Sequence, residues 1–157
     1  MAMQDHVVLW VDNDEDDQLI AKKAVGLSHP HLSVQGLYDG EELFQYLRRE
    51  GVFADNRSHP WPGIIFLGLH MSQRSGLDVL AEIRKDSRFK QIPVVMISTT
   101  GFEDEVEAAF RLGANAHVNR LTTFRDLCES IRRVLDTWLD GGGTPDKLYR
   151  NSSVYPA

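Results

Sequence analysis

Short apolar runs alternate with segments of helical periodicity along most of the chain, and this alternation constrains the fold more than any other feature. Three runs are almost unbroken, as expected of strands buried on both faces: Val7–Val11, Ile64–Leu67 and Val94–Ile97. Two weaker strand candidates, Ser33–Leu37 and Ala116–Asn119, suit outer positions in a sheet. Each of the five runs is followed by an amphipathic segment, so the order is strand then helix, repeated five times.

This order predicts a doubly wound α/β fold, in which helices cover both faces of a five-stranded parallel sheet. Two of the expected helices begin with capping-box patterns, Asp39 with Glu42 and Thr123 with Asp126. We assign residues 1–139 to one domain. Residues 140–157 begin with a glycine-rich stretch and are predicted to be a flexible tail or a dimerisation arm.

Charge and cysteine content narrow the class of protein. The 157 residues carry a net charge of −6, which argues against a nucleic-acid-binding surface spread over the whole chain. Cys128 is the single cysteine, so no internal disulfide can form, which fits a reducing compartment. The apolar run Val7–Val11 is too short for a signal peptide or a membrane helix. We therefore expect a cytoplasmic protein with no membrane contact.

The strand ends should meet at the carboxyl edge of the sheet, where such folds place their functional sites. Four segments meet there, at residues 12–17, 68–72, 98–101 and 119–121. The first is unusual because it packs five carboxylates into six positions: Asp12, Asp14, Glu15, Asp16 and Asp17. Carboxylates at a helix N-terminus are stabilised by the helix dipole, and clustered carboxylates also suit Mg²⁺. Both interpretations stay open on composition alone.

These segments also resemble a known family. The stretches VLWVDNDEDD, DGEELFQYLRREG, IIFLGLHMS, IPVVMISTTG and LGANAHVNRL are similar, in order and spacing, to the receiver domain of bacterial response regulators. The resemblance runs from about Val7 to Leu139 and is closest to stand-alone receivers, such as those paired with bacterial phytochrome kinases. It implies a flavodoxin-like sheet with strand order 2-1-3-4-5.

The resemblance also implies a chemistry. In the family, an aspartate after the third strand accepts a phosphoryl group from a histidine kinase, and an acidic pair after the first strand holds Mg²⁺. A hydroxyl residue and a lysine, after the fourth and fifth strands, contact the phosphoryl oxygens. The matching positions here are Asp12 and Asn13 for the acidic pair, Gly68 for the acceptor, Ser98 followed by Thr99 for the hydroxyl, and Arg120 for the lysine.

Glycine has no side chain and cannot be a nucleophile, and residues 64–72 contain no Asp or Glu. The chain is therefore interpreted as a pseudo-receiver: a non-enzymatic signalling module that meets its partner without phosphorylation. The expected partner is a histidine kinase, another regulator or a second copy of the chain. The expected partner face includes Asn119, Leu121 and His117, which holds the family's aromatic switch position.

Arg120 is expected to face Asp12 across the space at Gly68, with Asp14 as a second candidate partner. No cofactor and no tight metal site are expected, while weak Mg²⁺ binding at Asp12 and Asp14 stays open. Two alternatives remain. The chain could accept phosphate at an unmatched residue (Asp12, Asp14 or His70), or hold a small molecule in the space at Gly68. A flavin-binding protein is disfavoured, because a flavin phosphate would meet the acidic loop.

Overall fold

The computed structural model describes residues 7–71, 73–99, 103–139 and 154–156. Strands and helices alternate, as the apolar runs predict. The elements are β1 (Val7–Val11), α1 (Glu15–Ser28), β2 (Ser33–Leu37), α2 (Gly40–Leu47), the 3₁₀ helix η1 (Gly51–Ala54), β3 (Pro62–Gly68), α3 (Gly76–Lys85), β4 (Val94–Ser98), α4 (Glu103–Arg111), β5 (Ala116–Asn119), α5 (Phe124–Trp138) and β6 (Val154–Pro156).

The sheet has the order β2-β1-β3-β4-β5-β6. The first five strands are parallel, which confirms the predicted doubly wound sheet of order 2-1-3-4-5. The short strand β6 was not predicted and pairs antiparallel with β5. Residues 140–153 lie outside the described residues, so a flexible tail or a dimerisation arm stays a prediction for that segment.

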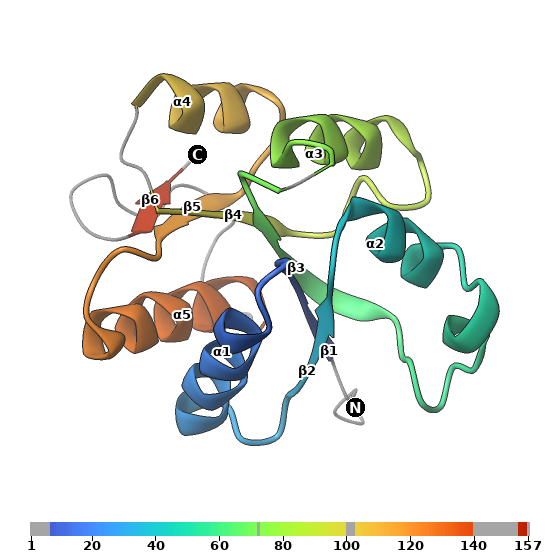
Figure 1. Ribbon diagram of the computed structural model, residues 1–157, viewed down its shortest axis with the longest axis horizontal. Coiled ribbons are helices and arrows are strands. Elements are labelled where there is room, and N and C mark those ends of the chain that lie inside the picture. Colours follow the sequence, from blue (N-terminus) through green and yellow to red (C-terminus); the bar gives the residue numbers. More distant parts are fainter. Residues whose placement is uncertain (1–6, 72, 100–102, 140–153, 157) are drawn as a thin grey trace.

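Helices cover both faces of the sheet (Figure 1), with α1 and α5 on one side and α2, α3 and α4 on the other. Side chains of β1 alternate between two cores, because successive residues of a strand point to opposite faces. Leu9 and Val11 join the core under α2, α3 and α4, and Val8 and Trp10 join the core under α1 and α5. All five residues of β1 are buried.

Local signals in the sequence account for several helix ends. The Asp39 carboxylate accepts a hydrogen bond from the Glu42 N–H at 2.9 Å, and the Thr123 hydroxyl accepts one from the Asp126 N–H at 3.1 Å. Gly113 has a φ of 110°, a conformation that other residues adopt only with strain, just after α4 ends. In the part of the chain that the structure describes, no helix is long and apolar enough to cross a membrane.

The amino edge of the sheet is held by one arginine of α3. Arg84 donates to the carbonyl oxygens of Gly113, Lys90 and Ile92 at 2.9, 3.1 and 2.8 Å. It also donates to the Asn115 Oδ1 atom at 2.9 Å, and this oxygen accepts the Val94 N–H at 2.8 Å. One guanidinium therefore joins α3 to the segment before β4 and to the segment before β5.

Candidate functional site

A pocket of about 130 Å³ opens at the carboxyl edge, where β1, β3, β4 and β5 end. The four segments predicted to meet there do come together, although Ser72, Thr100 and Gly101 lie outside the described residues. The lining residues are Asp12, Asn13, Asp14, Asp17, Gly68, His70, Met71, Ile97, Ser98, Thr99 and Arg120. All three lining carboxylates belong to the acidic segment that follows β1.

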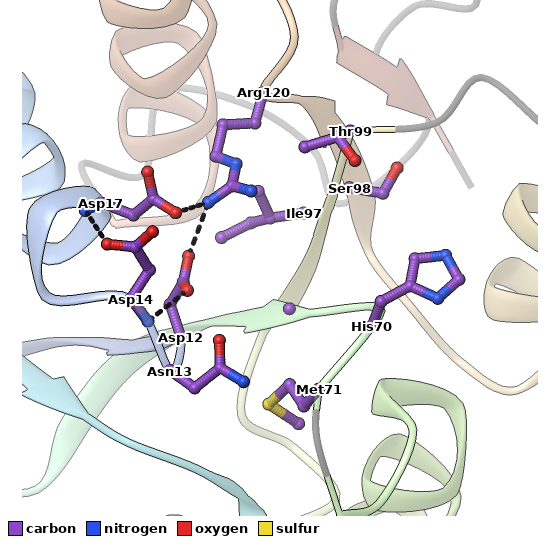
Figure 2. A pocket seen from close by; sticks show the side chains of 11 residues that line it. Asp12, Asn13, Asp14, Asp17, His70, Met71, Ile97, Ser98, Thr99 and Arg120 are labelled. Atoms are coloured by element: carbon purple, nitrogen blue, oxygen red, sulfur yellow. Dashed lines mark hydrogen bonds and ion pairs between the residues drawn. The ribbon is translucent and has the colours of Figure 1, made fainter.

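Arg120 extends into this pocket and bridges two carboxylates (Figure 2). Its Nη1 atom donates to Asp12 Oδ2 at 2.9 Å and also to Asp17 Oδ2. The other oxygen of the Asp12 carboxylate, Oδ1, accepts the Asp14 N–H at 3.0 Å. Both oxygens of this nearly buried carboxylate are therefore engaged within the chain.

Asp14 is not a partner of Arg120, so that part of the expectation was wrong. The Asp14 side chain caps α1 and accepts hydrogen bonds from the N–H groups of Asp16 and Asp17 at 2.8 and 3.4 Å. A carboxylate at the N-cap is turned back onto the first helical turn. Asp17, three residues further on, is the one that reaches Arg120. The acidic cluster drew attention to this segment, but composition did not distinguish its members.

Gly68 ends β3 and lines the pocket. A Cβ atom built there would lie 3.3 Å from the Val11 carbonyl oxygen, and 3.5 Å from Cγ of Met71. A Cβ atom at position 68 would thus be tight against the Val11 backbone and would otherwise meet a flexible thioether side chain. Nothing in the sequence pattern marked Met71 as a member of the pocket, because apolar residues most often serve the core.

Ser98 and His117 form a buried polar pair behind the pocket. The Ser98 hydroxyl lies 2.7 Å from His117 Nε2, and the side chains come from the neighbouring strands β4 and β5. His117 is fully buried, so its side chain cannot form part of an exposed partner face. This corrects the expectation for His117, which arose because the family resemblance places an aromatic switch residue at this position. Strand β5 is not at the edge of the sheet, because β4 pairs with one of its sides and β6 with the other.

Burial lowers the pKa of His117 to about 4, because the imidazolium would lose its hydration there. In the unfolded chain the pKa is near 6.5. Between pH 6.5 and about pH 4, His117 is protonated in the unfolded chain but stays neutral in the folded chain. The free energy of unfolding therefore decreases as the pH falls through this range. We expect His117 to remove about 2 kcal/mol from the free energy of unfolding between about pH 7 and pH 5.

Urea unfolding of the wild type and His117→Phe at both pH values measures this effect. The variant should lose less stability than the wild type on acidification, while His31→Gln, which changes an exposed histidine, should retain the wild-type pH dependence. Parallel pH profiles for the wild type and His117→Phe would show that His117 does not carry the effect.

The remaining candidates lie around the rim of the pocket. His70 is half-exposed, its Nε2 atom is 3.3 Å from the Glu105 carboxylate, and its ring points away from Asp12, Asp14 and Asp17 (Figure 2). Thr99 is exposed. The side chain of Asn119 accepts the Leu121 N–H at 2.8 Å, and Leu121 has 73% of its surface exposed.

Comparisons with known proteins agree with the fold. The family described as "Response regulator receiver domain" matches residues 8–132. The Response regulator Rcp1 of Synechocystis is 28% identical over 134 residues, which span 85% of this chain and 89% of that protein. The phosphorylated cyanobacterial phytochrome response regulator RcpA is 28% identical, with a TM-score of 0.78 over 88% of this chain and 96% of its own.

A third comparison is with the crystal structure of the Mn²⁺-bound form of response regulator Rcp1. That structure is 27% identical, with a TM-score of 0.73 over 86% of this chain and 95% of its own. The residues of the present chain do not fit a divalent cation well. Asn13 supplies an uncharged amide, Gly68 supplies no side-chain ligand, and a guanidinium already occupies Asp12. Among the described residues, no three His, Cys, Asp or Glu side chains are grouped to hold a metal.

Proposed function

Because this chain belongs to the response regulator receiver family and has glycine where the family has its phosphoacceptor, we propose that it acts in signalling as an interaction module that needs no phosphorylation. The observation that carries this proposal is Gly68. It ends β3 at the floor of the pocket and offers no nucleophile. The neighbouring residues of β3 and the following loop, up to position 72, contain no carboxylate to replace it.

The other candidate phosphoryl acceptors of the pocket already have partners within the chain. Both oxygens of Asp12 accept hydrogen bonds, and the Asp14 carboxylate caps α1. The His70 ring lies beside Glu105 and faces away from the three aspartates of the pocket. These contacts favour a pocket without phosphoryl chemistry over a receiver that is phosphorylated at an unmatched residue. They also support Arg120 as the residue that holds the pocket in one arrangement.

Receiver domains act through histidine kinases or other signalling proteins, and we place the partner of this chain in the same class. A second copy of the chain is the other candidate. The proposed contact surface lies where β5 ends, at Asn119 and Leu121, and the exposure of Leu121 supports this assignment. The proposed module is not an enzyme, and its net charge of −6 disfavours nucleic acid as the partner.

A small-molecule sensor is the second candidate function, because the pocket lacks the side chain that the family resemblance implies at position 68. The pocket of about 130 Å³ is lined mainly by charged and polar groups and suits only a ligand of few atoms. Native mass spectrometry of the purified protein tests this candidate, since a retained ligand adds its mass to the folded chain.

The proposed function predicts that acetyl phosphate and Mg²⁺ leave the intact mass of the wild-type protein unchanged. The informative comparison is a rebuilt acceptor site, made by Gly68→Asp together with Asn13→Asp and Arg120→Lys. This variant should gain the mass of one phosphoryl group, because a Cβ atom at position 68 meets only a tight carbonyl contact and the flexible Met71.

A receiver that retains its acceptor aspartate controls for the reagent. A phosphoryl adduct on the wild-type chain would contradict the proposal, and peptide mapping would then identify the residue that carries it. If only the rebuilt variant forms an adduct, the three substituted residues account for the lack of phosphorylation in the wild type, and the rest of the fold does not.

A further inference from the structure

The carboxyl edge of this sheet concentrates negative charge in a partly buried place. Asp12 and Asp17 have side chains that are 12% and 20% exposed, and both line the pocket together with Asp14. Carboxylates shielded from water in this way need a nearby positive charge, because neither hydration nor bulk salt screens them fully. This positive charge can come from a side chain of the protein or from a divalent cation in solution.

Arg120 is placed to supply it. One nitrogen, Nη1, lies on Asp12 Oδ2 and on Asp17 Oδ2, so a single guanidinium joins the end of β1 to the first turn of α1. Its side chain is 28% exposed, which weakens screening of both ion pairs by solvent. The ion pairs therefore act on two segments that would otherwise repel each other.

The backbone holds Arg120 in position for this contact. Its N–H donates to the Ser98 carbonyl oxygen at 2.7 Å, and its own carbonyl accepts the Thr122 N–H at 2.9 Å. The residue is thus fixed between the end of β4 and the turn that leads into α5. A positive charge held by the sheet itself requires little reorganisation when the chain folds.

From these contacts we infer that Arg120 is a built-in counter-ion, which makes the carboxyl-edge pocket independent of divalent cations. A cation that approached Asp12 would meet the guanidinium at the same carboxylate, and like charges at such distances repel. Asn13 and Gly68 provide no further charge to offset that repulsion. This inference concerns charge balance alone, and it can hold or fail separately from the proposed function.

Thermal unfolding in millimolar MgCl₂, against NaCl of equal ionic strength, tests the inference. The wild type should unfold at the same temperature in both salts. Arg120→Gln should unfold at a lower temperature than the wild type in NaCl and should regain part of the loss in MgCl₂. Arg125→Gln is the matched control, because Arg125 is an exposed arginine five residues further along and does not line the pocket. It should behave as the wild type.

Direct Mn²⁺ titration gives a second measurement, and it is informative on the wild type even where a variant folds poorly. Isotope-labelled wild-type protein should show little selective broadening of the amide signals of residues 11–14 when Mn²⁺ is added. Arg120→Gln should bind Mn²⁺ more tightly by on the order of tenfold, because one positive charge next to the ion is removed.

Several results would overturn the inference. Equal Mn²⁺ affinity in the wild type and Arg120→Gln would mean that Arg120 does not compete with the cation. A Mg²⁺-specific rise in the unfolding temperature of the wild type would mean that the pocket still depends on it. A phosphoryl adduct on the wild type would contradict the proposed function but would leave this inference standing, so the two failures are distinguishable.

Discussion

Replacing Arg84 with methionine is expected to lower the free energy of unfolding by about 4 kcal/mol, and the unfolding temperature by about 10 °C. The guanidinium of Arg84 donates four hydrogen bonds, three to backbone carbonyls and one to the Asn115 side chain. Burial lowers the pKa of Arg84, because the charged guanidinium is partly removed from water. Methionine fills a similar volume but removes the donor of all four bonds, although the Asn115 oxygen keeps the Val94 N–H as a donor.

Urea unfolding followed by circular dichroism measures the loss. Arg125→Met is the matched control, because that exposed arginine should change stability by no more than about 0.5 kcal/mol. A loss below about 1 kcal/mol in Arg84→Met would mean that the hydrogen bonds at the amino edge are readily replaced by water.

Gly76→Ala is expected to cost about 3 kcal/mol, because no space exists for its Cβ atom. That atom would lie 2.2 Å from the Gly68 carbonyl oxygen and 2.9 Å from the Leu69 Cα atom. Both contacts are with backbone, so no side chain can rotate away. The Gly76 N–H also donates to the Leu69 carbonyl oxygen at 2.8 Å, which holds the start of α3 tightly against the end of β3. The substitution must therefore move Gly68 and disturb the pocket.

Gly26→Ala provides the comparison. Gly26 lies on an exposed position of α1, and a Cβ atom there meets nothing within 4 Å. Alanine should stabilise this helix by about 0.5 kcal/mol, because it loses less backbone entropy on folding. Chemical denaturation should show a lower free energy of unfolding for Gly76→Ala and a higher one for Gly26→Ala, each relative to the wild type. Equal stability of Gly76→Ala and the wild type would contradict the structure at the base of the pocket.

Much of the fold follows from patterns that a single sequence carries. The strands Val7–Val11, Ser33–Leu37 and Ala116–Asn119 have the predicted bounds, and the central strands were predicted to within two residues at each end. Apolar runs of this kind have no stable place except inside a covered sheet. The strand β6 escaped prediction because three residues ending in proline carry almost no periodicity, and proline within a run argues against a strand.

The location of the site could be predicted from the sequence, but the side-chain contacts within it could not. Parallel topology brings the strand ends together, and this located Asp12, Gly68, Ser98 and Arg120 in one pocket. Whether Arg120 would pair with Asp14 or Asp17 depends on helix capping and side-chain direction, which residue types alone do not determine. The burial of His117 likewise depends on the elements packed around β5.

The bare Cα atom at Gly68 also bears on how long a signal lasts. A phosphorylated aspartate keeps a receiver in its signalling state until the acyl phosphate hydrolyses, so the hydrolysis rate sets how long the signal lasts. A module without an acceptor side chain forms no acyl phosphate. Under the proposed function, the duration of its output is set by the rate at which the partner dissociates, and its strength is set by the concentrations of the two proteins. Such a component reports how much of it is present at a given moment and keeps no record of earlier stimulation.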